Sequence, residues 1–250
     1  MQKYRTESRV LKDPEEVWQD WLALQARADC SWFMSWGWIG TWLEQIVHDL
    51  DPILVRVSHG EDLVGLSIFV PRDIKRRHVF HASALFLNEY PFDDRNMVIE
   101  YNGILAARGH EMMVCTGTLR HLYQAYPQKD EFHFGAIAEG PDLDCLSKAA
   151  DDLGGLKVCE ASTAWQIDLD SLEPGLDAFL ATLSKNRRAQ LRRSLRSYES
   201  QGSLTLEEAQ DTGQALAFFD GLKKLHTVRR QAKGEGGAFA NPLWERFHRT

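Results

Sequence analysis

Two short apolar runs constrain the fold of the first part of the chain. Residues 52–58 (PILVRVS) and 63–71 (LVGLSIFVP) each have the length of a strand, and the turn-forming sequence HGED separates them. Two further segments of strand character follow at 78–87 and 97–105. Strands joined by short turns pair antiparallel, so these segments predict a sheet whose first strands are antiparallel.

Segments with helical periodicity lie before and after these strands in the sequence. On both sides of them, apolar residues recur at the three- and four-residue spacing that is typical of an amphipathic helix. We expect helices at 14–29, 36–49, 110–126 and 142–153, and further strands at 131–138 and 157–169. The resulting order, α-α-β-β-β-β-α-β-α-β, predicts an α/β (α+β) fold in which helices cover a mixed sheet.

The sequence Glu173-Pro174-Gly175 interrupts this pattern and predicts a boundary between two domains, residues 1–172 and residues 173–250. In the second domain we expect a helix at 176–183, a basic helix after Ser184, a strand at 203–209, and helices at 212–233 and 242–249. No sheet partner for that strand follows in the sequence, so the second domain is expected to be incomplete in this chain.

The charge, the cysteines and the hydropathy of the chain argue against several classes of protein. The net charge of −7 argues against generic nucleic-acid binding, for which a basic domain is expected. The four cysteines show neither a CxxC pair nor a regular spacing, as expected of reduced cytosolic thiols. No apolar run approaches the ~18 residues of a membrane span, and the N-terminus lacks the apolar core of a signal peptide. A cytoplasmic protein is therefore expected.

Familiar catalytic motifs are absent from the sequence. It contains no GxSxG, HExxH, Walker A or GxGxxG motif, and its histidines are scattered, so no metal site is expected. Asp93 and Asp94 are adjacent carboxylates in a polar loop. They fit a structural turn better than an acid/base pair, because neighbouring loop residues rarely converge on one point.

The basic helix is unusual for such an acidic chain. Residues 184–196 hold six cations and no acid. Like charges four residues apart cost about 0.2–0.5 kcal/mol per pair, and cations in a first turn oppose the helix dipole. A bound phosphate or carboxylate would relieve both costs. The alternative is a solvated helix that pairs with acids elsewhere. One stripe of this helix is formed by Lys185, Arg188, Arg192 and Arg196.

This helix and the block after it resemble a known family. The sequence SKNRRxxxRR at 184–193, ending in ESQG, resembles the opening of the acyltransferase domain in the CelD-like, cellulose-biosynthesis branch of the GNAT superfamily. The elements LHxxR at 225–229, GEGGAFANP at 234–242 and FH at 247–248 are similar to the next block of that family. The related FemABX peptidyltransferases have a similar Asn-Arg-Arg motif. Before residue 175 the resemblance lies mainly in the order of helices and strands. The sequence YNG at 101–103 is a weak local match to the family.

The resemblance implies tandem GNAT-like domains and transfer of an acyl group, usually from acetyl-CoA, to an amine or hydroxyl. A cytosolic enzyme acting on an amino sugar, a nucleotide sugar or another anionic polysaccharide precursor is expected, without a metal. In such domains a Gly-rich turn between a strand and a helix holds the pyrophosphate of CoA. At that point after Leu105 the chain has AARGH, with one glycine, so the first domain is not expected to bind CoA in this way. The corresponding loop of the second domain is expected beyond Thr250.

The resemblance also implies an anion site on the basic helix. Arg187 and Arg188 would contact an anionic group of substrate or cofactor, and Lys185 and Arg192 would support them. His226 and Arg229 lie three residues apart on one predicted helix, so both can act at one site. His226 is a candidate general base because histidine titrates near neutral pH. The alternatives are a histidine at the helix–core boundary and a surface ion pair for Arg229.

Two other functions remain open. A FemABX-like peptidyltransferase would use aminoacyl-tRNA, and the basic helix suits such a phosphate-rich ligand, although the acidic chain argues against it. A non-catalytic GNAT-like module of a polysaccharide synthase would use the basic helix to dock an acidic partner. DNA binding and a membrane span are not expected in any of these interpretations.

Overall fold

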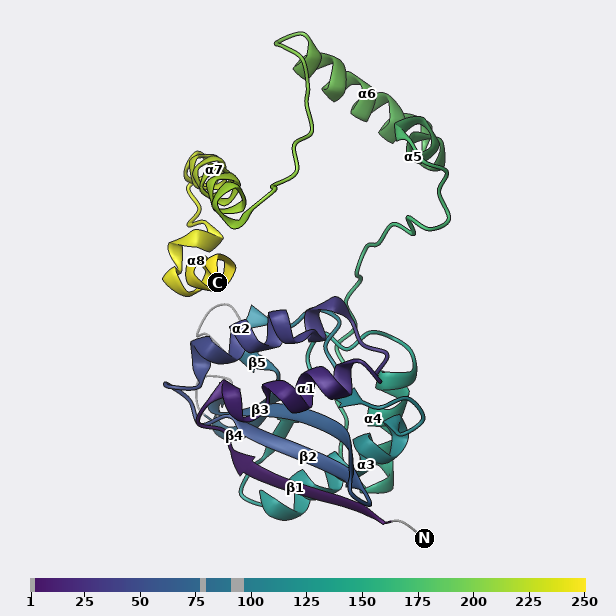
Figure 1. The fold of residues 1–250 in the computed structure, drawn as a ribbon, viewed down its shortest axis with the longest axis vertical. Coiled ribbons are helices and arrows are strands. Elements are labelled where there is room, and N and C mark those ends of the chain that lie inside the picture. The colour runs from purple at the N-terminus through teal and green to yellow at the C-terminus, as the bar shows by residue number, and fades with distance from the viewer. Residues whose placement is uncertain (1–2, 77–79, 91–96) are drawn as a thin grey trace. The chain divides into compact units, whose positions relative to one another are not determined.

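The structure, a computed structural model, describes residues 3–76, 80–90 and 97–250. The chain divides into two compact units, residues 1–158 together with 241–250, and residues 159–240 (Figure 1). The start of the strand predicted at 78–87 and the pair Asp93 and Asp94 lie outside the described residues. Each unit is described by itself.

The first unit is built on a mixed six-stranded sheet with the order β1-β2-β3-β4-β8. The first four strands pair antiparallel, β8 pairs with β4 in parallel, and β7 pairs with the first half of β3. A separate two-stranded ladder joins β5 and β6. The strands are β1 (Tyr4–Val10), β2 (Ile53–His59), β3 (Asp62–Arg76), β4 (Phe80–Leu87), β5 (Glu89–Tyr90), β6 (Met97–Val98), β7 (Leu105–Ala106) and β8 (Glu131–His133). The predicted mixed sheet is confirmed.

Helices cover both faces of this sheet. Arg56 of β2 reaches Asp20 of α1, whereas its neighbour Val57 faces Gly117 of α3. Successive side chains of a strand point to opposite faces, so α1 and α3 lie on opposite sides of the sheet. The helices of this unit are η1 (Pro14–Glu16), α1 (Trp18–Gln25), η2 (Trp32–Met34), α2 (Trp36–Ile46), α3 (Glu111–Ala125), α4 (Pro141–Asp152) and α8 (Pro242–Arg249).

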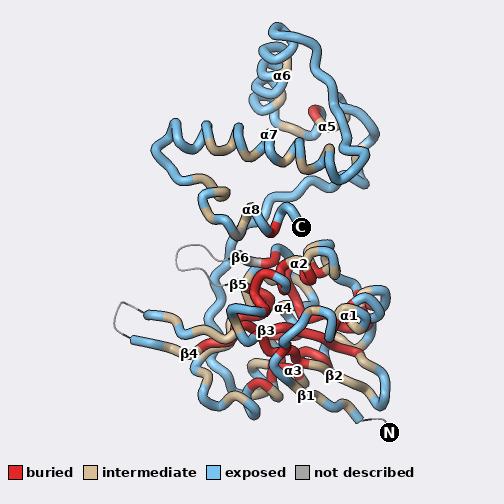
Figure 2. The backbone as a smooth tube through the Cα atoms, turned by 60° about the vertical axis from the view of Figure 1, so that its left-hand side comes forward, coloured by how far each residue is buried: buried red, intermediate tan, exposed pale blue. Residues whose placement is uncertain are grey.

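The core lies between the sheet and these helices, as the buried segments in Figure 2 show. Trp21 of α1 and Trp42 of α2 are fully buried, and the indole N–H of Trp21 donates to the carbonyl of Met34 at 2.9 Å. Large buried aromatic side chains contribute most to such a core. Trp32, in contrast, is 67% exposed. The N-terminal tryptophans therefore divide between the core and the surface.

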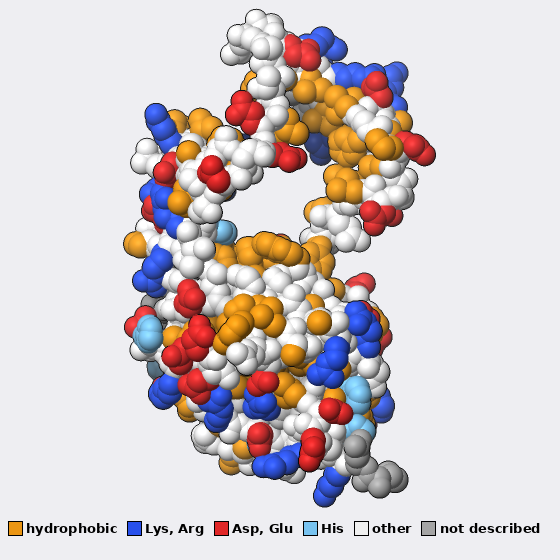
Figure 3. Space-filling model, in the orientation of Figure 1, with side chains coloured by type: hydrophobic (Ala, Val, Ile, Leu, Met, Phe, Trp, Pro, Cys, Tyr) orange, Lys and Arg blue, Asp and Glu red, His pale blue; other side chains and the backbone are white. Residues whose placement is uncertain are grey.

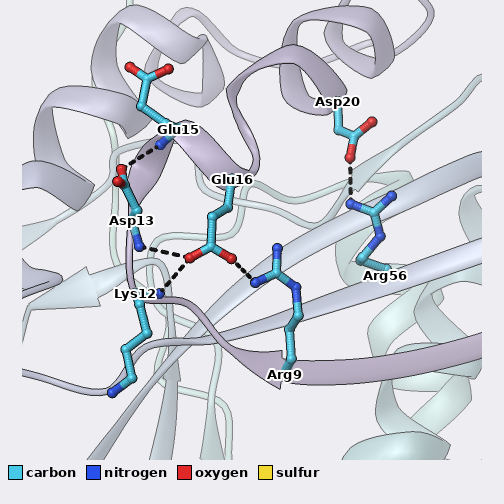
Figure 4. Close-up of polar contacts among 7 residues, drawn as sticks. All are labelled: Arg9, Lys12, Asp13, Glu15, Glu16, Asp20 and Arg56. Atoms are coloured by element: carbon cyan, nitrogen blue, oxygen red, sulfur yellow. Dashed lines mark hydrogen bonds and ion pairs between the residues drawn. The ribbon is translucent and has the colours of Figure 1, made fainter.

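The turn from β1 into the first helices is fixed by charged side chains (Figure 4). Asp13 caps η1 by accepting from the backbone N–H of Glu15 at 2.9 Å, and Glu16 accepts from the N–H of Asp13 at 3.1 Å. This reciprocal pattern is a capping box. Arg9 of β1 also bonds to Glu16 and holds the pKa of its carboxyl below the ordinary value. Arg56 donates to Asp20 at 2.5 Å and so ties β2 to α1.

The second unit is helical. It contains α5 (Leu176–Thr182), α6 (Lys185–Glu199), α7 (Thr212–Gln231) and η3 (Ala238–Ala240). All residues from 159 to 240 are described, and none of them forms a strand. The predicted strands at 203–209 and 157–169 are therefore wrong. Their alternating apolar residues favour a strand, but a strand also needs a hydrogen-bonded neighbour, and these segments have none in the described chain.

Other differences from the predicted elements concern the first unit. The strand predicted at 97–105 is reduced to its two ends, because Tyr101 takes a left-handed φ of 48° that a strand cannot contain. Strand β1 was not predicted, since its side chains are mostly polar. Helix α8 belongs to the first compact unit, where Phe247 is buried and packs edge-on against Trp38. The compact units divide the chain after residue 158 and place residues 241–250 with the first unit.

Candidate functional sites in the two units

The basic helix forms as predicted and begins where predicted. Ser184 is the N-cap of α6, and its hydroxyl accepts from the backbone N–H of Arg187 at 3.4 Å. No residue of α6 is buried, and Lys and Arg side chains gather along it in the space-filling view (Figure 3). The exposed first turn of a capped helix, with cations beside it, is suited to binding an anion.

The cations of this helix differ in their partners. Arg192 pairs with Asp177 of α5 at 3.3 Å. Lys185, Arg187 and Arg188 form no ion pair with any residue that the structure describes. Lys185 and Arg187 are exposed, and Arg188 is half-buried. Arg192 is thus held by an internal acid, whereas the three cations nearest the helix start are available to an external anion.

His226 of α7 is half-buried and packs against one aromatic ring. The ring of Phe239 stands edge-on to its imidazole, with ring centroids 5.2 Å apart. The Nδ1 atom of His226 is buried and has no hydrogen-bond partner among the described residues. Arg229 forms no described ion pair either; instead its neighbour Arg230 pairs with Glu235 at 2.5 Å. No described hydrogen bond or ion pair joins His226 or Arg229 to the cations of α6.

The loop between β7 and α3 is the place in the first unit where the sequence resemblance implies that a pyrophosphate loop would lie. The backbone N–H groups of this loop are already used. Gly109 donates to the carboxylate of Glu111 at 2.9 Å, and His110 donates to the carbonyl of Ala107 at 2.9 Å. The N–H groups of Ala107 and Arg108 donate to the carbonyls of Val64 and Arg27, each at 2.9 Å. These residues do not fit a pyrophosphate, because Glu111 places an anion at the glycine where one would bind.

A pocket of about 540 Å³ opens beside this loop. Its walls come from the segment after α1, the segment before β7, and the first turn of α4. Sequence reasoning missed this pocket, apart from the local likeness at residues 101–103. Residues with polar side chains in its wall include Asp29, Cys30, Ser31, Asn102, Arg108 and Asp142.

Asn102 organises the inner wall of the pocket. Its side-chain N–H groups donate to the carbonyls of Leu87 at 2.9 Å and Gly135 at 3.2 Å. Its side-chain oxygen accepts from the N–H of Gly103 at 2.8 Å and from the side chain of Asn88 at 2.9 Å. Asn102 therefore joins the end of β4, the segment before β7 and the segment after β8.

Residues with strained backbone conformations lie close to Asn102. Among the described residues, the non-glycine residues with positive φ are Asn88 (46°), Tyr101 (48°) and Ala136 (53°). Tyr101 precedes Asn102, and the carbonyl of Ala136 accepts from the backbone N–H of Asn102 at 3.0 Å. Left-handed non-glycine residues are costly and are typical of sites that bind ligands.

The charges around the pocket are partly balanced. Arg108 donates from Nε to the carboxylate of Asp29 at 2.6 Å and from Nη2 to the carbonyl of Ala28 at 3.0 Å. Partial burial, with the nearby carboxylate of Glu111, raises the pKa of Asp142. The pocket thus offers a paired guanidinium and a separate carboxylate to a small polar molecule.

Among residues 3–76, 80–90 and 97–250, no three His, Cys, Asp or Glu side chains lie close enough together to hold a metal ion. Within the same residues, no helix has the length and apolar character needed to cross a membrane.

One family model and one solved structure are similar to this chain. Residues 185–250 match the family model Acetyltransf_6, described as "Acetyltransferase (GNAT) domain". No curated protein matches. One solved structure, titled "Crystal structure of a probable acetyltransferase", is similar to this chain with 11% identity and a TM-score of 0.37, over 65% of this chain and 97% of that one. The family match places a GNAT acetyltransferase domain, of a family related to the CelD-like and FemABX proteins, in the C-terminal region of the chain.

Proposed function

We propose that this chain is a GNAT-type N- or O-acyltransferase of the CelD-like branch, organised as tandem GNAT-like domains over residues 1–172 and 173–250. It would move an acyl group, acetyl in the first instance, from acyl-CoA to an amino sugar, a nucleotide sugar or another polysaccharide precursor. The observation that carries the proposal is the match of residues 185–250 to the GNAT acetyltransferase domain, which begins at the unpaired cations of α6.

The proposed anion site is the first turn of α6. Arg187 and Arg188 would bind a phosphate or carboxylate of acyl-CoA or of the acceptor, because guanidinium groups bind such oxyanions through paired hydrogen bonds. Lys185 would add charge at the helix start. Arg192, which is held by Asp177, would support the site from one turn further along.

His226 is the proposed general base. The nitrogen or oxygen nucleophile of the acceptor would attack the thioester carbonyl, lose its proton to His226, and displace the CoA thiolate. With Nδ1 buried, Nε2 is the ring nitrogen left to take that proton. Arg229, one turn away on α7, would bind an anionic group of the acceptor.

Isothermal titration with acetyl-CoA tests the proposal. In a chain extended past Thr250, so that the expected pyrophosphate loop is present, we expect binding to the wild type and at least a tenfold weaker affinity for the double variant Arg187→Glu/Arg188→Glu, since each reversal replaces an attraction by a repulsion. The matched control is Arg193→Glu/Arg196→Glu, which makes the same charge change on the same helix but away from its start. Its affinity should stay within about threefold, the change expected from screened charges at a distance.

Two other outcomes would replace the proposal. Absence of acetyl-CoA binding at millimolar ligand, with tight tRNA binding that weakens steeply with salt, would favour the aminoacyl-tRNA-dependent peptidyltransferase. Absence of both would favour a non-catalytic module. Circular dichroism of each variant shows whether the helices remain intact, so that lost binding is not confused with lost structure.

A further inference from the structure

The pocket of the first unit carries one carboxylate without a partner. Asp142, in the first turn of α4, lines the pocket and remains accessible there. Its carboxylate forms no hydrogen bond or ion pair with any residue in the described part of the chain. One of its oxygens lies 3.4 Å from the position that a β-carbon of residue Gly103 would take, so the carboxylate faces the segment before β7. The pocket therefore presents an unpaired negative charge beside Gly103.

The other charges of the pocket wall do not balance Asp142. Arg108 is already held by the carboxylate of Asp29 at 2.6 Å and by the carbonyl of Ala28 at 3.0 Å. The carboxylate of Glu111 lies near enough to Asp142 to raise its pKa, in addition to the effect of partial burial. A cation bound in the pocket would relieve this repulsion and would be attracted by both carboxylates.

An aromatic ring lines the same pocket. Tyr101 is 39% exposed, and its ring stacks on that of Phe33 with the centroids 6.2 Å apart. Phe33 in turn packs edge-on against Trp32 and Trp38, with centroid distances of 5.4 and 5.1 Å. These contacts hold the ring of Tyr101 in place while it remains accessible. The face of such a ring attracts organic cations, ammonium groups included.

We propose that this pocket is a binding site for a small hydroxylated amine, held in its ammonium form by the carboxylate of Asp142 and the ring of Tyr101. The cavity of about 540 Å³ has the volume of a site for a small organic molecule. Hydroxyl groups of the ligand would bond to Nη1 of Arg108 and Oδ2 of Asp29, two atoms without a partner among the described residues. None of these residues has a part in the proposed acyl transfer.

A titration with glucosamine, followed by amide NMR of the full chain, tests the site. In a slightly acidic buffer, in which the sugar amine is protonated, we expect the amide signals of residues 101–103 to shift with a dissociation constant in the millimolar range or below. Glucose, which has a hydroxyl group in place of the amine, should bind at least tenfold more weakly at matched salt. Equal affinity for the two sugars, or no shift of these signals at tens of millimolar glucosamine, would overturn the proposal.

Two pairs of variants test the assigned contacts. Asp142→Asn keeps the shape of the side chain and removes its charge, so glucosamine should bind at least tenfold more weakly. Asp144→Asn makes the same change in the same turn of α4 but outside the pocket wall, and its affinity should stay within about twofold. Tyr101→Leu removes the ring and should weaken binding about threefold, whereas Tyr101→Phe keeps the ring and should bind like the wild type.

The dispersion of the amide spectrum shows for each variant whether the fold is intact. Unchanged glucosamine affinity in a folded Asp142→Asn variant would refute the assigned ammonium site. Because the titration contains no acetyl-CoA, its outcome is independent of whether the chain transfers an acyl group.

Discussion

Gly237 lies directly against the imidazole of His226. A β-carbon at position 237 would stand 3.0 Å from both Cε1 and Nδ1 of that ring. The φ of Gly237 is not in the left-handed region, so it is the space beside His226, and not the backbone conformation, that restricts the residue at this position. The turn after α7 thus determines where the candidate base lies.

Gly237→Ala should therefore displace His226. The added methyl group needs the ring to move by a few tenths of an ångström, and a general base out of position loses on the order of tenfold or more in rate. We expect changed imidazole signals of His226 in NMR spectra and at least a tenfold lower acetyl transfer. Gly236→Ala is the matched control, because a β-carbon there meets nothing within 4 Å. The same spectral change in both variants would show that the effect is not local to the ring.

Gly65 sets the separation between the sheet and α3. A β-carbon on this residue of β3 would lie 2.4 Å from Cγ1 of Val114. Gly65→Ala should lower the free energy of unfolding by about 2 kcal/mol through overpacking, and Val114→Ala alone by a similar amount through lost burial. The double variant should lose at least about 1 kcal/mol less than the sum, since each change relieves the other.

Urea unfolding of the single and double variants measures this coupling. Gly37→Ala provides the control, because its β-carbon would meet nothing within 4 Å and alanine is the better helix former. It should be neutral or stabilising by up to about 1 kcal/mol. Strictly additive losses at Gly65 and Val114 would mean that the two residues do not meet in solution.

Among the polar residues of the pocket wall, Asn102 should lower the free energy of unfolding most when it is replaced. Alanine there leaves buried donors and acceptors of several segments without partners, which costs about 1–3 kcal/mol for each group. We expect Asn102→Ala to lower the free energy of unfolding by about 3 kcal/mol or more. Ser31→Ala, which removes one exposed hydrogen bond to the carbonyl of Tyr101, should cost less than about 1 kcal/mol. Equal losses for the two variants would contradict the central role of Asn102.

Much of the fold follows from local sequence patterns. The helices over α2, α3, α4 and α7 show helical spacing of apolar residues, and they form close to the predicted bounds. Strands were less predictable, because a strand depends on its neighbour as well as on its own residues. Residues 4–10 are polar and pair with β2, whereas residues 203–209 alternate and pair with nothing described.

The basic helix and the pocket also differ in how far the sequence predicts them. The cations of α6 are contiguous in sequence, so charge pattern and helix geometry were enough to predict an exposed basic helix. The pocket depends on Asn102, whose side chain bonds to carbonyls 15 and 33 residues away. No local pattern reports which distant carbonyls an asparagine will reach. The weak likeness at residues 101–103 was the available signal, and the unusual φ of Tyr101 shows in hindsight why that segment is not a strand.

Glu89 of β5 gives the first unit a pH-dependent stability. Its side chain is buried, with 3% of the residue exposed, and its carboxyl group lies against Gly135. Burial raises its pKa from 4.5 to about 7. In the unfolded chain the carboxyl ionises near pH 4.5, while in the folded protein it stays neutral until about pH 7. Below pH 4.5 the carboxyl is neutral in both the folded and the unfolded chain, so Glu89 does not lower the free energy of unfolding there. Between pH 4.5 and about 7 it ionises only in the unfolded chain, so the free energy of unfolding falls as the pH rises.

Glu89→Gln should remove this dependence. Glutamine has nearly the same size and shape as the neutral carboxyl form but cannot ionise, so the free energy of unfolding of the variant should match that of the wild type at pH 4.5 and exceed it above pH 7 by up to about 3 kcal/mol, at about 1.36 kcal/mol per pKa unit. Urea unfolding at half-unit pH steps measures the difference. Glu139→Gln, at an exposed position, should leave the profile of the wild type unchanged. A constant offset between Glu89→Gln and the wild type across this range would show that Glu89 has the same pKa in the folded and unfolded chain.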